Sequence, residues 1–254
     1  MTRSVPAVPT TTGTGPETRT PQDRYATWIL TAFGLAALGD LAGLLAGSDI
    51  AHAVFKPLLM PLLAAYVAFG GGPRLLTAAL LCGGAGDTLL LVDADPAFLA
   101  GMGSFAAGHL CYLALFRRHG NGHPRARGTS LALAYATALA ATVTLLWPDL
   151  PSDMRGPVAG YSVLLTGMAF AATRLGPAAA VGGALFLLSD SLIATDVADW
   201  PQAPRPDFWI MLTYLAAQVL LARGILARAT GTPTGTDVTG TDATVTSGSA
   251  PAPR

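Results

Sequence analysis

The stretch "HAVFKPLLMPLLAAY", His52 to Tyr66, places the only lysine of this 254-residue chain in an apolar run that contains two prolines. Other apolar stretches of about twenty residues recur along most of the sequence, and an α-helix needs about that length to cross the hydrocarbon core of a bilayer. Hydrophobic residues make up 52% of the chain and charged residues only 12%, against roughly 25% charged in ordinary soluble domains. The pattern predicts an all-α, polytopic membrane protein.

Eight apolar stretches predict a bundle of about eight transmembrane helices. The predicted spans are 26–46, 50–70, 73–92, 97–116, 129–147, 157–173, 177–195 and 208–227. They form a membrane domain over residues 25–228. The tails at 1–24 and 229–254 are rich in Pro, Thr and Gly, and we expect both to be disordered because they cannot bury enough apolar surface to fold.

The arginines are distributed unevenly between the two sides of such a bundle. Twelve of the fourteen fall in the tails and the even-numbered loops, and only Arg155 and Arg205 fall in the odd-numbered loops. Because basic loops stay on the cytoplasmic side, we predict a multi-pass protein of the cell membrane with both termini in the cytoplasm. The net charge is zero, so nucleic acid is not an expected partner. The sequence does not indicate an oligomeric state.

Several polar residues lie inside the predicted spans, where a charged group at the bilayer centre costs about 2.5–3.5 kcal/mol. They are Asp40, Lys56, Asp87, His109 and Asp190, together with the neutral Tyr112, Tyr161, Tyr214 and Gln218. The predicted topology brings the three aspartates and the lysine to one layer near the non-cytoplasmic side. Hydrogen bonds between membrane helices average only about 0.6 kcal/mol, too little to offset that cost. We therefore interpret these residues as a functional site.

Two segments of the chain are similar to each other. "GDTLLLVD" (86–93) and "SDSLIATD" (189–196) match in residue type at an offset of 103 positions. Both lie on helices that are predicted to run outward, as a parallel duplication would require. A parallel 4+4 repeat of four-helix halves is therefore a hypothesis for this bundle.

Five motifs, in order along the chain, resemble the YhhN family of membrane proteins. They are "KPLLMP" (56–61), "GDTLLL" (86–91), "G-x-x-x-F-x-x-x-H-x-x-Y" (101–112), "G-x-x-x-F-x-x-SDS" (182–191) and "YLAAQ" (214–218). The resemblance covers most of the membrane domain and neither tail. It implies an eight-helix bundle with lysoplasmalogenase activity. Such an enzyme hydrolyses the vinyl ether bond of a lysoplasmalogen to a fatty aldehyde and a glycerophospho-ethanolamine or -choline.

Carboxylates suit this reaction. A vinyl ether is protonated at its β-carbon, and water adds to the resulting oxocarbenium ion before the hemiacetal collapses. Glycosidases stabilise a related ion with two carboxyl groups in different protonation states. We therefore expect Asp87 and Asp190 to be catalytic, one as the acid and one ionised, with their order left open. Lys56 would balance the charge or bind the lipid phosphate, and His109 and the tyrosines would orient water.

Other functions also fit the polar residues. Intramembrane carboxylates are typical of proton- or cation-coupled transporters, and only the family resemblance favours the hydrolase over this alternative. A non-catalytic lipid-binding or assembly protein is a third alternative. The sequence has no dense cluster of metal ligands such as H-x-x-x-H, so we expect neither a metal nor another cofactor.

The two prolines of the opening stretch also bear on the second helix. Pro57 and Pro61 each lack a backbone N–H, which predicts a kinked or unwound segment. Irregular backbone at membrane depth is tolerated where it lines a cavity or where neighbours replace its hydrogen bonds. The prolines therefore indicate either a cavity beside Lys56 or a packing contact.

Overall fold

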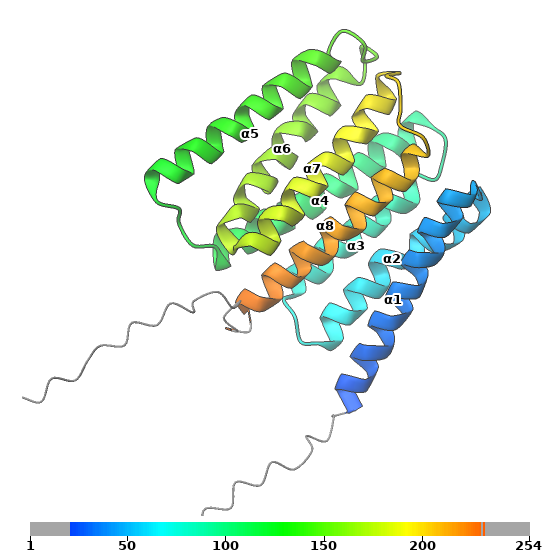
Figure 1. Cartoon of the computed structure of the whole chain (residues 1–254), viewed down its shortest axis with the longest axis vertical. Helices are drawn as coiled ribbons and strands as arrows, with labels where there is room; N and C mark the ends of the chain where they lie inside the picture. The colour runs from blue at the N-terminus through cyan, green and yellow to red at the C-terminus, as the bar shows by residue number, and fades with distance from the viewer. Residues whose placement is uncertain (1–20, 230, 232–254) are drawn as a thin grey trace, which may run out of the picture.

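The computed structural model describes residues 21–229 and 231. The predicted disordered tails lie outside this part of the chain, apart from their innermost residues. Within it the chain forms eight α-helices and one short 3₁₀ turn, with no β-strand (Figure 1). The elements are α1 (Pro21–Ala46), α2 (Asp49–Phe69), α3 (Arg74–Leu89), α4 (Asp95–His119), α5 (Arg125–Leu146), α6 (Arg155–Ala172), η1 (Thr173–Leu175), α7 (Pro177–Val197) and α8 (Pro206–Ala229). The predicted all-α bundle is confirmed, and each predicted span corresponds to one helix.

Seven of the eight helices in the described residues are long and apolar enough to cross a membrane. The exception is α3, which has 16 residues and is therefore about 24 Å long, against a hydrocarbon core of about 30 Å. The predicted span 73–92 is too long because the helix ends at Leu89. Helices α2, α4 and α8 pack around α3, so it need not match the thickness of the lipid. The chain is a multi-pass membrane protein.

The helices pack mainly against their neighbours in sequence, α1 to α4 on one side and α5 to α8 on the other. The two halves meet where α4 packs on α6 and where α8 packs on α1, α3 and α4. Helix α5 lies at the edge of the bundle and packs chiefly on α6 (Figure 1). The turns α1–α2, α3–α4, α5–α6 and α7–α8 gather at one end of the bundle, which we call the α1–α2 end (Figure 1). The 4+4 repeat stays a hypothesis.

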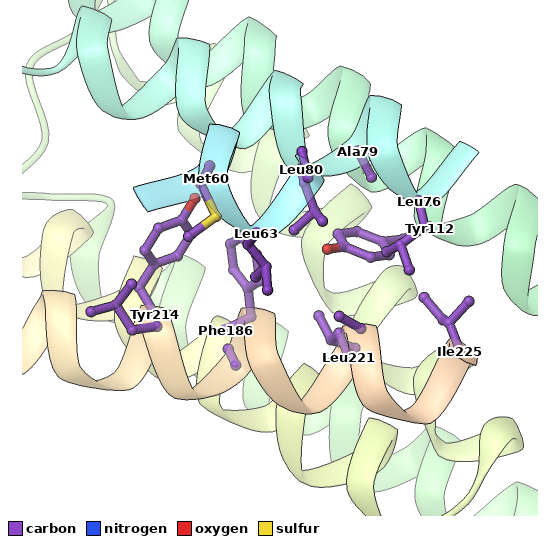
Figure 2. Close-up of a cluster of buried hydrophobic side chains, with 14 of the residues drawn as sticks. Met60, Leu63, Leu76, Ala79, Leu80, Tyr112, Phe186, Tyr214, Leu221 and Ile225 are labelled. Atoms are coloured by element: carbon purple, nitrogen blue, oxygen red, sulfur yellow. The ribbon is translucent and has the colours of Figure 1, made fainter. Parts of the chain in front are cut away.

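An apolar core joins the two halves. Its buried side chains include Met60, Leu63, Leu80, Tyr112, Phe186, Tyr214 and Leu221, which meet between α2, α3 and α8 in Figure 2. Residues that are hydrophobic and buried in a membrane bundle gain by close packing more than by removal from water. This core therefore depends on tight contacts between helices.

Helix α2 is continuous from Asp49 to Phe69 through both prolines. An unwound segment, one of the two forms predicted at Pro57 and Pro61, is therefore not formed. The structure instead shows a packing contact: a Cβ added to Gly84 of α3 would lie 3.0 Å from Met60 Cβ and 3.2 Å from Pro61 Cδ. The glycine lets the proline-containing turn of α2 lie directly against α3.

Helices α7 and α8 approach each other closely at Gly182. A Cβ added there would lie 3.0 Å from both the carbonyl oxygen of Ala217 and the backbone nitrogen of Leu221. Backbone atoms cannot move aside as a flexible side chain can. This position of α7 therefore requires glycine.

We expect Gly182→Ala to lower the thermal unfolding midpoint by the equivalent of about 1–3 kcal/mol, because the added methyl group overpacks the contact. The matched control is Gly167→Ala on α6, where nothing lies within 4 Å of an added Cβ. It should leave the midpoint unchanged or raise it, since alanine favours a helix over glycine by about 1 kcal/mol. Thermal unfolding of both variants in detergent measures the difference, and equal shifts would contradict the packing argument.

Candidate active site

The candidate residues of the sequence analysis separate into two groups. The Asp190 group consists of Asp190, Tyr161 and His109. The Asp87 group consists of Asp87, Lys56, Asp40, Tyr112, Tyr214 and Gln218. The layer predicted from the topology is therefore divided into two parts by the packing of the helices.

The Asp190 group is a row of hydrogen-bonding side chains from three helices. The hydroxyl of Tyr161 on α6 donates to Oδ2 of Asp190 on α7. The same hydroxyl lies 3.0 Å from Nε2 of His109 on α4. His109 is buried, and its Nδ1 has no hydrogen-bond partner within the described residues. The hydrogen bonds of this row can be donated from His109 through Tyr161 to an ionised Asp190, or from a protonated Asp190 through Tyr161 to His109. The row therefore suits proton transfer at Asp190.

Asp190 lines a cavity of about 300 Å³ between α4, α5, α6 and α7. The wall is mostly apolar and includes Phe98, Met102, Phe105, Leu139, Val158, Leu165, Leu187 and Val197. Asp190 is the one carboxyl group among the lining residues, which include no lysine or arginine. A mostly apolar pocket with a few converging polar groups is the usual form of a small-molecule site.

The cavity opens sideways. Three of its lining residues are exposed at the surface of the bundle: Ala138 of α5, and Ala184 and Leu188 of α7. The opening therefore lies between two helices that are long and apolar enough to cross the membrane. A molecule in the hydrocarbon layer can reach the cavity without passing through water.

A second apolar cluster closes the cavity toward the α1–α2 end of the bundle. It consists of Leu146, Leu150, Met154, Val158 and Ala198, with Phe98, Met102 and Trp200 packed against it. The indole N–H of Trp200 donates to Oδ2 of Asp149 at 2.8 Å. This hydrogen bond ties the α7–α8 connection to the α5–α6 connection across the end of the cavity.

Asp87 lies outside the cavity lining. Its side chain is only 3% exposed, and its Oδ2 has no hydrogen-bond partner in the described structure. Lys56, also buried, is the positive charge that acts on it most strongly. The lysine has no carboxylate oxygen within 4.0 Å among residues 24–229. Lys56 therefore acts on Asp87 through space rather than in a direct ion pair.

Helix α8 contributes two polar side chains to the Asp87 group. Gln218 accepts a hydrogen bond of 2.6 Å at Oε1 from the hydroxyl of Tyr112 on α4. The Tyr214 hydroxyl lies next to both Gln218 and Asp87. A Cβ added to Gly83 would lie 2.8 Å from that hydroxyl and 3.2 Å from Gln218 Nε2. Gly83, one turn before Asp87, therefore makes the space through which α8 reaches α3.

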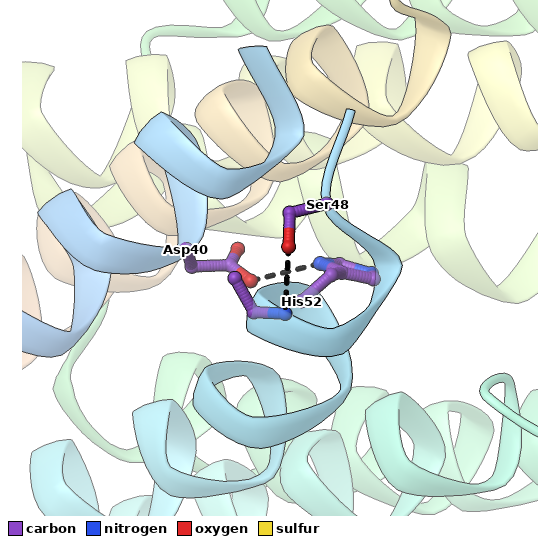
Figure 3. Close-up of polar contacts among 4 residues, drawn as sticks. Asp40, Ser48 and His52 are labelled. Carbon is purple, nitrogen blue, oxygen red and sulfur yellow. Dashed lines mark hydrogen bonds and ion pairs between the residues drawn. The ribbon is translucent and has the colours of Figure 1, made fainter. Parts of the chain in front are cut away.

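Asp40 pairs with a histidine that the sequence analysis did not single out. Oδ1 of Asp40 lies 2.8 Å from Nδ1 of His52 (Figure 3). Asp40 is fully buried. The hydroxyl of Ser48 caps the start of α2 by accepting from the backbone N–H of Ala51. The signal for His52 was its position one turn before Lys56, since residues four apart share a helix face.

Aromatic rings lie where the two groups meet. The rings of Phe105, Phe186 and Tyr214 meet edge to face, with centroids 5.4–6.4 Å apart. Phe105 lines the cavity on one side. On the other side it lies against Gly86, where an added Cβ would be 2.6 Å from the ring. Asp87 is the next residue of α3 and does not line the cavity.

The described residues contain no group of three or more His, Cys, Asp or Glu side chains arranged to hold a metal ion.

Comparison with known proteins finds a family whose sequence model matches this chain. The YhhN family model matches residues 51–225, which include every candidate residue except Asp40. The chain is 36% identical over 157 residues to a human protein named "Lysoplasmalogenase TMEM86B". The alignment covers 62% of this chain and 66% of the human protein, which is just under two thirds of the human protein's length. It is 31% identical over 215 residues to a Mycobacterium bovis protein named "Lysoplasmalogenase", covering 78% and 81% of the two chains. No solved structure matches.

Proposed function

We propose that this chain, which belongs to the YhhN family, is an integral-membrane ether hydrolase of the lysoplasmalogenase type. It cleaves the vinyl ether bond of a lysoplasmalogen and releases a fatty aldehyde and a glycerophospho-ethanolamine or -choline. The observation that carries the proposal is an apolar cavity that opens toward the hydrocarbon layer and has one carboxyl group in its wall. The relatives named lysoplasmalogenase support the same reaction.

The substrate class follows from the shape and chemistry of this cavity. A lysoplasmalogen has a single hydrocarbon chain, which can enter from the bilayer between α5 and α7. The vinyl ether is weakly polar and suits the position beside Asp190, between the apolar wall and the polar row.

The Asp190 group supplies the acid–base chemistry. The protonated carboxyl of Asp190 transfers its proton to the β-carbon of the vinyl ether, and a positive charge develops on the α-carbon and the ether oxygen. Water adds to the α-carbon and returns a proton to the carboxylate. The hemiacetal then breaks its C–O bond to give the aldehyde and the glycerol hydroxyl, so that one water is consumed. Tyr161 and His109 hold Asp190 in position and carry protons to and from it.

The Asp87 group supplies a fixed negative charge. We assign Asp87 as the ionised carboxylate, because the buried Lys56 acts on it and it does not line the cavity. Its charge acts through the low-dielectric interior and stabilises the oxocarbenium ion beyond Phe105. Tyr112, Tyr214 and Gln218 position this carboxylate, and Asp40 with His52 supports the same region.

The direct test uses purified full-length protein in detergent or liposomes. We expect it to release aldehyde from a 1-alkenyl lysophospholipid but not from the 1-alkyl or 1-acyl lipid of the same chain length, because only the vinyl ether forms an oxocarbenium ion by protonation of carbon. A chelator should leave the rate unchanged. Failure to release aldehyde, together with proton or cation flux in proteoliposomes, would overturn the proposal in favour of a transporter.

We expect Ala184→Phe to lower aldehyde release by at least about tenfold, because a ring at the mouth takes the space of the substrate chain. The loss should be smaller for shorter alkenyl chains. Val181→Phe is the matched control: Val181 lies one turn earlier on α7, is 51% exposed and does not line the cavity. Rates measured across a series of chain lengths test this prediction, and equal losses in the two variants would contradict it.

The proposed setting is the cell membrane with both termini in the cytoplasm. The distribution of arginines supports this orientation. The cavity, near the α1–α2 end, would then lie in the half of the membrane away from the cytoplasm. A C-terminal reporter that is active only in the cytoplasm tests the orientation.

A further inference from the structure

The proposed substrate carries a phosphate, and the residues around the cavity limit what can bind it. Lys56 does not line the cavity. At the α1–α2 end, the cations among the described residues other than histidine are Arg155 and Arg205. The guanidinium of Arg205 lies across Gly47 at the α1–α2 turn, where an added Cβ would be 2.8 Å from Nη1. Arg155 is the arginine near the cavity.

Arg155 begins α6, the helix that contributes Tyr161 to the Asp190 group. It lies one turn before Val158 and two turns before Ser162, both of which line the cavity. Residues three and seven apart share one side of a helix. Arg155 therefore lies on the cavity side of α6, just beyond the apolar cluster that closes this end.

The axial distance fits the length of the substrate. Arg155 precedes Tyr161 by six positions, which corresponds to about 9 Å along the helix axis. In a lysoplasmalogen, five single bonds of about 1.5 Å join the vinyl ether oxygen to phosphorus, so they span about 6 Å when extended. A phosphate oxygen and one hydrogen bond cover the remaining distance of about 3 Å. A vinyl ether at Asp190 thus brings the phosphate to the level of Arg155.

The guanidinium is held in place and still has free donors. Its Nε donates to the carbonyl of Leu150 at 3.1 Å, and Nη2 donates to the carbonyl of Pro148 at 3.2 Å. It also lies 5.8 Å from the centre of the Trp147 ring. A guanidinium has five N–H donors, so three remain after these two bonds. No carboxylate lies within 4.0 Å of it among the described residues, and the planar donor edge matches phosphate geometry.

We propose that Arg155 binds the phosphate of the lysolipid at the rim of the cavity and so holds the vinyl ether beside Asp190. The inference rests on the proposed function. It makes the phosphate, rather than the ethanolamine or choline beyond it, the recognised part of the head group. Both head groups are therefore accepted at similar rates.

The test compares two substrates with the same alkenyl chain: a 1-alkenyl lysophospholipid and a 1-alkenylglycerol, which lacks the phosphate. We expect Arg155→Gln to lower kcat/KM for the phospholipid by about 10- to 100-fold, mostly through KM, as loss of hydrogen bonds to a charged group predicts. It should leave kcat/KM for the alkenylglycerol unchanged. Arg155→Lys should recover part of the loss, and Arg205→Gln should behave as wild type with both substrates.

Each other outcome overturns the inference. If both variants lose kcat/KM equally on both substrates, Arg155 stabilises the α5–α6 connection and does not bind the phosphate. If neither substrate shows a loss of kcat/KM, the phosphate binds elsewhere. The wild-type protein separates this inference from the proposed function. If it releases no aldehyde from either substrate, the proposed function itself has failed.

Discussion

Asp190→Asn is expected to lower the rate of aldehyde release by at least about 100-fold while the protein still folds. The amide has the shape of the carboxyl group and can still accept the hydrogen bond from Tyr161. It cannot donate a proton to carbon or take one from water. General acid–base groups contribute about 10²–10⁴-fold to a rate, so this substitution should remove a contribution of that size.

The matched control is Asp196→Asn, an exposed aspartate on the same helix that does not line the cavity. It should keep the wild-type rate. Aldehyde is measured with a coupled dehydrogenase, and the thermal midpoint of each variant reports folding. A folded Asp190→Asn protein with full activity would remove Asp190 from the mechanism.

Asp87→Asn is expected to lower aldehyde release by about 100-fold or more, although Asp87 does not line the cavity. Loss of one preorganised electrostatic group typically costs about 10²–10³-fold in rate. The substitution also leaves Lys56 buried without the carboxylate that acts on it. Removing one member of a buried charge pair costs about 3–5 kcal/mol when the two are in contact, so we expect a clear but smaller loss of thermal stability here.

The double variant Lys56→Met, Asp87→Asn separates stability from chemistry. It removes both buried charges, so its thermal midpoint should recover toward that of the wild type, as it does when buried ion pairs are replaced together. Its activity should stay as low as that of Asp87→Asn. Recovery of activity along with stability would mean that Asp87 is structural and that Asp190 works without a second carboxylate.

The helices, the family and the polar residues at membrane depth could all be predicted from local properties of the chain. The eight apolar runs predicted the eight helices, because the length and hydropathy of a segment decide whether it can cross a bilayer. Five motifs, each short and weak alone, indicated the YhhN family in advance of the match over residues 51–225. The polar residues in apolar runs were also visible without a structure, since a buried charge is costly wherever the helix packs.

The arrangement of those residues could not be predicted in the same way. Topology put Asp87 and Asp190 in one layer, yet only Asp190 lines the cavity. His52 was overlooked, although it bonds Asp40 at the turn between α1 and α2. From the sequence, Arg155 contributed only to the predicted orientation of the protein in the membrane. Each of these relations joins residues on different helices, and the spacing within one helix carries no information about the rotation of the next.

The sequence by itself determined that the chain crosses a membrane several times, which residues are polar at membrane depth, and to which family it belongs. Those properties depend on single segments, and the bilayer acts on each segment separately. The tertiary structure alone decided that α4 to α7 enclose a cavity, that Asp190 lines it and that Asp87 does not. These depend on how helices pack, and in lipid that packing is set by close contacts such as Gly83, Gly84 and Gly182 rather than by hydropathy.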